Sequence, residues 1–285
     1  MKKLLARLER TRSLDRISDP LRNAVAAITG KARVEDALHG TWLGHPLHPA
    51  AVQFPVGAWI SATVLDLLPG RRHRRSALIL LAVGTAGALP AAATGAVDWT
   101  TLSATQRRVG LVHAAANSVA LGLFTASIAA RVGGRHRGGR LLSLAGLGVA
   151  GASAFLGGHL SFAQSAGVNY GATALSLAPT DWQDIGALAE FADGSVTPRT
   201  VGEVPVIVYR DGSQVTVLIG RCAHFGGPLH EGPTKDVDGA LCIECPWHGS
   251  RFRLADGIAV QGPTAADQPM LDTRVVNGRL EVRQP

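Results

Sequence analysis

Cysteine, aromatic residues and charge are all scarce in this sequence. Its 285 residues include three Cys, and only 5% are aromatic and 17% charged. Three cysteines cannot build a disulfide framework, and all three lie between Cys222 and Cys245 beside histidines, so cysteine here indicates a metal site. The basic residues flank long apolar segments instead of forming patches interleaved with aromatic side chains, which argues against nucleic acid and favours a lipid bilayer as partner.

Acidic residues are scarce in the first part of the chain only. Residues 1–180 hold 19 Lys and Arg against 7 Asp and Glu, whereas residues 181–285 hold 9 against 14. The net charge of +7 is therefore the sum of +12 in the first part and −5 in the second, and the length leaves room for two domains. We divide the chain into an N-terminal segment (1–38), a membrane domain (39–165), a linker (166–180) and a C-terminal domain (181–285).

The first residues lack the uninterrupted apolar core of a signal peptide, because Arg7, Glu9 and Arg10 follow the opening leucines. We expect this segment to be retained. Leucine, isoleucine and valine recur at helical spacing among its basic residues, which predicts a basic amphipathic helix over residues 1–38. Such a helix can lie on an anionic bilayer, or it can pack on the protein itself.

Four segments are long and apolar enough to cross a bilayer, which takes about 20 residues. They cover residues 50–68, 76–97, 109–130 and 141–163. The connections between them are short, so neighbouring spans should run antiparallel in an all-α four-helix transmembrane bundle. Glycine and alanine crowd the last three spans, and small residues allow helix backbones to approach closely in lipid.

Four crossings place the start of the first span and the end of the last on one side of the membrane. Polar residues that the count assigns to this side are His45, His48, Asp98, His113 and His159. Intramembrane histidines are costly, so they suggest a role in redox chemistry. Two imidazoles could ligate a haem b iron or accept protons from a quinol, with Asp98 orienting one of them; alternatively, all of them are structural anchors at helix ends.

From about residue 199 the sequence is typical of an all-β domain. β-Branched runs flank the turn sequences Asp211-Gly212 and Asn277-Gly278. Two loops interrupt the strands, one with Cys222 and His224 and the other with Cys245 and His248. Two thiolates and two imidazoles could hold a tetrahedral zinc ion, but the glycines and prolines around them favour a more particular site.

The two loops, Cys-Ala-His and Cys-Pro-Trp-His-Gly-Ser, resemble the Rieske fingerprint, and the resemblance covers most of residues 180–283. It implies a [2Fe-2S] cluster with Cys222 and Cys245 on one iron and His224 and His248 on the other. Residues 39–165 resemble a family of bacterial four-span membrane domains of unknown function, which implies the bundle topology and no particular activity.

Four neighbouring positions refine this resemblance. Respiratory Rieske proteins carry a disulfide between the two loops, but the matching residues here are Gly227 and Trp247. Ser250 matches the hydroxyl donor to a bridging sulfide, whereas Phe252 replaces a tyrosine that donates to a cysteine sulfur. Fewer donors stabilise the reduced cluster less, so we expect a potential below that of quinol-oxidising relatives and a closer likeness to ferredoxins of dioxygenases and small subunits of nitrite reductases.

We therefore expect a membrane-anchored electron-transfer protein, more a carrier or oxidoreductase subunit than a stand-alone enzyme, that serves a redox partner protein. The alternatives are an electron donor in an oxygenase system and a redox or nitric-oxide sensor that uses the bundle as an anchor. The orientation signals conflict: eight arginines lie in the two turns opposite the histidines, but nine Lys and Arg lie in the N-terminal segment. The difficulty of moving that segment across the membrane favours a cytoplasmic cluster.

Overall fold

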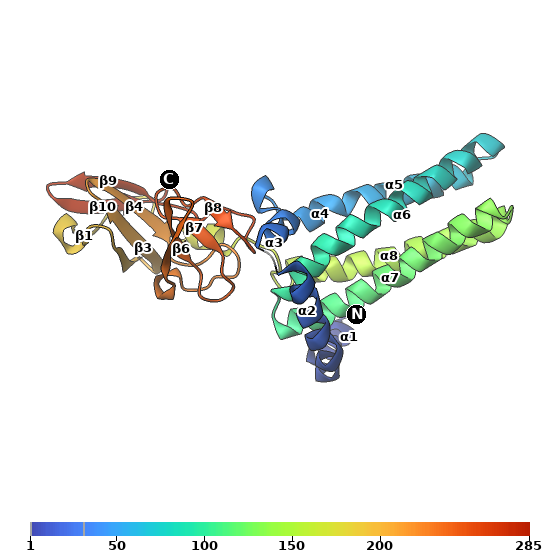
Figure 1. Ribbon diagram of the computed structural model, residues 1–285, viewed down its shortest axis with the longest axis horizontal. Helices are drawn as coiled ribbons and strands as arrows, with labels where there is room; N and C mark the ends of the chain where they lie inside the picture. Colours follow the sequence, from blue (N-terminus) through green and yellow to red (C-terminus); the bar gives the residue numbers. More distant parts are fainter. Residues whose placement is uncertain (1, 31) are drawn as a thin grey trace. The chain divides into compact units, whose positions relative to one another are not determined.

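The structure, a computed structural model, describes residues 2–30 and 32–285 and consists of two compact units (Figure 1). Residues 2–30 and 47–166 form a helical unit. Residues 32–46 and 167–285 form a second unit built around β-strands, called the β unit below. The predicted fold class, a bundle of long apolar helices followed by an all-β domain, is confirmed.

The division of the chain differs from the predicted one at two places. Residues 32–46, which the sequence assigns to the N-terminal segment and the membrane domain, belong to the β unit. Residues 167–180, predicted as a linker, also belong to it and include the helix α9, Tyr170–Leu175. Both segments are polar or irregular in sequence, and long-range packing determines where they lie.

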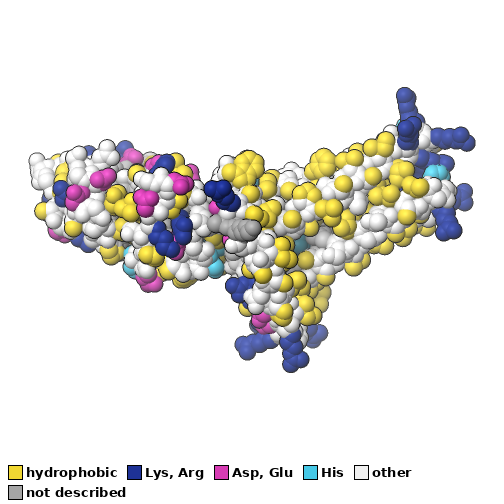
Figure 2. Space-filling model, viewed as in Figure 1, with side chains coloured by type: hydrophobic (Ala, Val, Ile, Leu, Met, Phe, Trp, Pro, Cys, Tyr) yellow, Lys and Arg dark blue, Asp and Glu magenta, His cyan; other side chains and the backbone are white. Residues whose placement is uncertain are grey.

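Among its described residues, the helical unit has four helices that are long and apolar enough to cross a membrane. They are Leu47–Leu67, which comprises α4 (Leu47–Ala51) and α5 (Gln53–Leu67), then α6 (Arg71–Thr100), α7 (Ala104–Val132) and α8 (His136–Phe162). At most 28% of their most apolar windows is buried inside the protein. Their outer surfaces are correspondingly rich in hydrophobic side chains (Figure 2), as required for contact with lipid.

Small residues bring the helices of the bundle together. α5 packs against α6, and α7 packs against α8. In the core Trp59 stacks on Phe124 with ring centroids 4.2 Å apart. A β-carbon at Gly84 would lie 2.9 Å from the Trp59 ring nitrogen, so only glycine permits α6 to approach α5 this closely.

A buried ion pair lies at the end of the bundle where α5 and α7 terminate. The Arg131 guanidinium of α7 donates to both carboxylate oxygens of Asp66 of α5, at 2.8 and 2.5 Å. It also donates to the hydroxyls of Ser127 and Ser143, and Arg140 lies 3.6 Å from the carboxylate. These bonds connect three helices through one charge pair.

The N-terminal helices pack on the bundle through polar contacts. α1 covers Lys2–Arg10, the short 3₁₀ helix η1 covers Arg12–Leu14 and α2 covers Asp15–Thr29. Arg108 of α7 forms a bidentate pair with Asp15, and Glu9 bonds His159 of α8 at 2.8 Å. Of the two arrangements open from sequence, the structure has the helices packed on the protein. Apolar side chains such as Leu4 and Ile28 are still exposed and could contact a bilayer.

Three antiparallel sheets form the β unit. The first contains β1 (Gln183–Ala187), β10 (Arg279–Arg283) and β9 (Asp272–Val276). The second contains β2 (Val196–Val201), β3 (Val204–Asp211) and β4 (Gln214–Ile219). The third contains β5 (Thr234–Val237), β6 (Ala240–Glu244), β7 (Arg251–Arg253) and β8 (Ala259–Gln261).

The predicted turn sequences form tight hairpins. Asn277 and Gly278 connect β9 to β10 with φ angles of 51° and 75°, the left-handed values that a two-residue turn of this kind requires. Gly212, with φ of 59°, begins the turn between β3 and β4. The third sheet packs over a core that contains Ile207, Leu218, Leu229, Ile243, Phe252 and the two loop cysteines.

Candidate metal centre

Two loops of the β unit have the same backbone geometry around a cysteine. The amide of Cys222 donates to the carbonyl of Gly227, five residues on, and the amide of Cys245 donates to the carbonyl of Ser250, also five residues on, each at 2.8 Å. In both loops the residue four positions after the cysteine is a glycine with positive φ, Gly226 or Gly249, whose amide bonds back to the cysteine carbonyl. Each loop therefore closes on itself and presents its sulfur.

Backbone amides surround both sulfurs. The Cys222 sulfur accepts hydrogen bonds from the amides two and three residues on, those of His224 and Phe225, and the Cys245 sulfur accepts from the corresponding amides of Trp247 and His248. Such donors stabilise negative charge on sulfur. A hydrogen bond between the two sulfurs raises the pKa of Cys222 and lowers that of Cys245.

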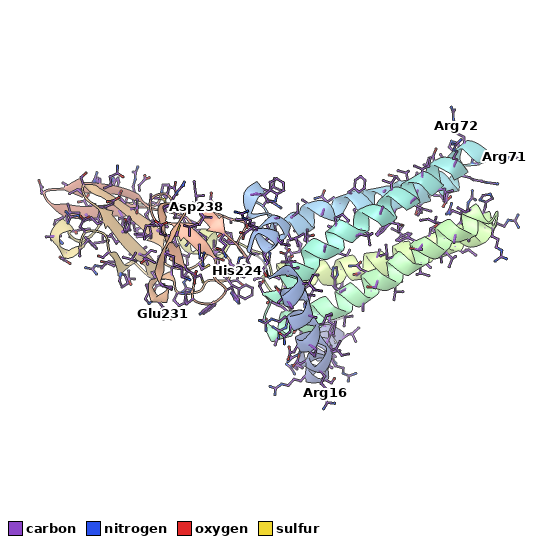
Figure 3. All side chains as sticks on the ribbon, in the orientation of Figure 1. Arg16, Arg71, Arg72, His224, Glu231 and Asp238 are labelled. Carbon is purple, nitrogen blue, oxygen red and sulfur yellow. The ribbon has the colours of Figure 1, made fainter. Side chains whose placement is uncertain are left out.

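The two histidines of the loops form a second pair beside the cysteines. Their ring centroids are 5.0 Å apart and the ring planes are nearly perpendicular, at 88°. Burial lowers the pKa of His224 to about 3, which keeps its imidazole neutral, the form that binds a metal. Figure 3 marks His224 in the loop region of the β unit.

A third loop, residues 262–268, makes hydrogen bonds to both of these loops. The amide of Thr264 donates to the buried hydroxyl of Ser250 at 3.3 Å. The side chain of Gln268, which is 2% exposed, donates to the carbonyls of Ile219 and Arg221 and accepts from the amide of Ala223. Gln268 therefore holds the first loop at both ends of Cys222.

Gly227 provides room for the second loop. A β-carbon at this position would lie 2.8 Å from the Cys245 sulfur and 3.1 Å from the Trp247 ring. No side chain fits there, and the Trp247 ring occupies the space between the loops while remaining about half exposed. The loops are held together by this packing and by the third loop.

The donor set fits a binuclear cluster. In the described part of the chain, no three Cys, His, Asp or Glu side chains converge on one ion position. The four loop residues instead form a sulfur pair and an imidazole pair, which matches the division of ligands between two irons. Cys222 and Cys245 are also almost fully buried, as is required to protect iron–sulfur bonds from water.

Comparison with known families agrees with this geometry. Residues 181–275 match the family model described as the Rieske [2Fe-2S] domain. The β unit is a Rieske [2Fe-2S] domain. Residues 44–170 match the family described as a predicted membrane protein, DUF2231, so the chain joins a DUF2231 membrane domain to a Rieske domain, as the two predicted resemblances imply.

Two relatives of the Rieske domain are ferredoxins. The chain is 30% identical over 102 residues to ferredoxin CarAc of Metapseudomonas resinovorans and covers 92% of it. It is 28% identical over 102 residues to the anthranilate 1,2-dioxygenase ferredoxin subunit of Burkholderia cepacia and covers 91% of that protein. These matches include 35% and 36% of the present chain. The electron-transfer character predicted from sequence is confirmed at the level of the domain.

A shorter match has higher identity, and solved structures also match the Rieske domain. The Rieske domain-containing protein of Homo sapiens is 50% identical over 52 residues, which are 18% of this chain and 32% of that protein. The ferredoxin of carbazole 1,9a-dioxygenase from Nocardioides aromaticivorans IC177 is 26% identical, with a TM-score of 0.33; the match covers 36% of this chain and 98% of that one.

The positions expected to tune the cluster lie where the loops meet. Ser250 is fully buried between the second and third loops of the Rieske domain. Phe252 on β7 is also fully buried, in the hydrophobic core next to Cys245, and brings no hydroxyl to the site. Cys242 on β6 is buried with its thiol directed to the Ala240 carbonyl at 3.4 Å, and burial raises its pKa.

The polar residues predicted near the membrane have separate hydrogen-bond partners. In the helical unit His48 bonds the Ala91 carbonyl through Nδ1, and His113 bonds the Ser153 carbonyl through Nδ1 and Asn117 through Nε2. His159 bonds Glu9. His45 lies in the β unit, where its ring bonds the Pro46 carbonyl, and Asp98 lies in the last turn of α6.

Sequence reasoning missed two residues of the site. Gln268 is one, because a buried glutamine in an irregular loop has no recognisable spacing. Tyr170 is the other: its ring packs 5.4 Å from that of Phe225, and its amide donates to the Ala223 carbonyl. It lies in the segment predicted as a linker, and its position at the start of a short helix gave no signal.

Proposed function

We propose that Cys222 and Cys245 bind one iron of the [2Fe-2S] cluster and that His224 and His248 bind the other. The pairing of sulfurs and of imidazoles supports this division. The cluster would take up and release one electron at a time. The chain's own groups would hold it: four amides stabilise the charge on the two sulfurs, and burial keeps His224 neutral.

Serine substitutions test this ligand set with an internal control. Cys222→Ser and Cys245→Ser should lose the visible absorption and the EPR signal of the reduced cluster, and iron should fall from two atoms per chain. Cys242→Ser is the matched control, because it changes a buried cysteine three residues from Cys245, and it should keep both signals. Loss of the cluster in the control alone, or zinc in place of iron in the unmodified protein, would overturn the assignment.

We also propose that the chain is a carrier of comparatively low potential that serves a redox partner. The named relatives include a dioxygenase ferredoxin subunit, which supports electron donation to an oxygenase component over the sensor alternative. Gly227, Trp247 and Phe252 leave the site without a loop-to-loop disulfide and without a tyrosine donor to sulfur. EPR-monitored titration should give a potential in the lower part of the range known for Rieske centres, about −150 to +300 mV; a value near the top would refute this argument.

For the membrane domain we propose exchange of electrons with quinone in preference to haem b. An axial haem ligand needs an available Nε2, but Asn117 engages Nε2 of His113 and Glu9 engages Nε2 of His159. His48 is the better candidate for a quinone, because the Ala91 carbonyl fixes its ring and Gly95 makes room for it. His48→Ala should abolish oxidation of the chemically reduced cluster by a short-chain quinone, whereas His73→Ala, at the other end of α6, should not. A haem absorption band in the purified protein would contradict this proposal.

We propose that the Rieske domain faces the cytoplasm. The nine basic residues of the N-terminal segment support this orientation, because they are hard to translocate. The absence of a disulfide between the cluster loops also suits a reducing compartment. A tag at the C-terminus should be protected from protease in intact cells and cleaved in inverted vesicles; the reverse pattern would place the domain outside.

A further inference from the structure

A segment that precedes the membrane spans is packed on the Rieske domain. It consists of the helix α3, Ala32–His39, and the 3₁₀ helix η2, Thr41–Leu43, and we call residues 32–43 the upstream cap. The 3₁₀ helix η2 packs against β8 of the same unit. The segment is separated from the rest of the Rieske domain by more than 120 residues of sequence, so its position depends on long-range contacts.

Two hydrogen bonds hold the upstream cap on the third loop. The Asp36 carboxylate accepts from the Gly262 amide at 2.7 Å, and the Thr41 hydroxyl donates to the Thr264 carbonyl at 3.0 Å. A β-carbon on Gly262 would lie 3.0 Å from the Thr41 hydroxyl oxygen and 3.5 Å from the His39 ring. The cap therefore sits directly on the loop backbone, at a glycine that leaves no gap.

The third loop, which binds the upstream cap, is also hydrogen-bonded to the second cysteine loop. The amide of Thr264, whose carbonyl binds Thr41, donates to the Ser250 hydroxyl. A chain of hydrogen bonds thus runs from the cap through the backbone of one residue, Thr264, to the residue expected to donate to a bridging sulfide. Because Thr264 satisfies the acceptor side of this hydroxyl, the Ser250 proton is left to point elsewhere.

His39 lies at the inner end of the cap. It is 4% exposed, although it is the last residue of a short helix. Its ring is close enough to His224 and to Asp36 to interact with both electrostatically. The two proposed histidine ligands accordingly differ in exposure, since His224 is partly buried and His248 is exposed.

We propose that the upstream cap, with His39 at its inner end, shields the His224 side of the cluster from water and leaves the His248 edge as the route for electrons to a partner. This inference rests on the proposed ligand set. A shielded cluster is harder to reduce, because reduction adds negative charge that water would stabilise. The cap thereby lowers the potential and restricts partner contact to one side.

The test compares two double variants of the full chain in detergent. Asp36→Ala with Thr41→Val removes both anchoring bonds, whereas Arg33→Ala with Val34→Ala changes exposed residues of the same helix and serves as control. After transfer to D₂O, pulsed EPR of the reduced cluster measures deuterium near the iron, and an EPR-monitored titration measures the potential. The first variant should show stronger deuterium modulation and a higher potential at unchanged cluster content, and the control should match the unmodified protein.

Each outcome bears on one proposal only. Unchanged deuterium modulation and unchanged potential in the first variant would overturn the cap. If that variant loses its cluster, His39→Ala decides, because it opens the cover at one residue and leaves both anchoring bonds: increased deuterium modulation supports shielding, and none refutes it. Absence of a Rieske EPR signal in the unmodified protein would instead refute the proposed ligand set.

Discussion

Replacing Asp66 by leucine should destabilise the helical unit through the charge left behind. Arg131 has a side chain that is only 2% exposed, and Asp66 supplies two of its hydrogen bonds. Removing one partner of a buried pair costs about 3–5 kcal/mol. Ser127 and Ser143 continue to accept from the guanidinium, which offsets part of this loss, so we expect a cost near the lower limit, about 3 kcal/mol.

A double-mutant cycle measures this quantity. Unfolding by SDS in mixed micelles, followed by far-UV circular dichroism, is compared for Asp66→Leu, Arg131→Leu and the double variant. The double variant should lose less than the sum of the single variants, because it leaves no unpaired charge. Arg137→Leu, an exposed arginine of the α7–α8 turn region, is the control and should lie within about 0.5 kcal/mol of the unmodified protein. Strictly additive losses, or a loss from Asp66→Leu no larger than the control, would refute the reasoning.

Three further changes probe the Rieske domain. Ser250→Ala removes a hydroxyl expected to stabilise the reduced cluster, and a lost bond of about 1.4 kcal/mol should lower the potential by about 60 mV in voltammetry; no shift would exclude this bond. Gly227→Val places carbon against the Cys245 sulfur, so iron per purified chain should fall well below that of the unmodified protein, and full occupancy would contradict the close packing. Gln268→Leu removes the side-chain partner of three backbone groups, two of them in buried residues, and should lower the stability of the domain by about 3 kcal/mol in thermal unfolding; an unchanged midpoint would show that water replaces the side chain.

The parts of the structure that could be predicted are those that short stretches of sequence encode. The four spans follow from runs of apolar residues, and the Asn277-Gly278 hairpin follows from residues that adopt positive φ at little cost. The two cysteine loops combine local hydrogen bonds with glycines at fixed distances from the cysteine, so their likeness to a Rieske site could be recognised.

The parts that could not be predicted depend on partners far apart in the chain. Asp36 and Gly262 are 226 residues apart, and nothing near either residue indicates the bond between them. Counting crossings placed the membrane histidines on one side of the bilayer, but it could not show that Glu9 would bind His159 or that Asn117 would bind His113. Side-chain partners decide what each histidine can do, and spacing alone does not reveal them.

The Rieske domain is assembled from two pieces of chain with about 120 residues between them, and this imposes an order on biosynthesis. The upstream cap leaves the ribosome first, but the loop that it binds is made only after all four spans have been translated. All four spans must therefore be synthesised before the domain can close. A fragment that begins at residue 167 would therefore carry the two cysteine loops without the upstream cap.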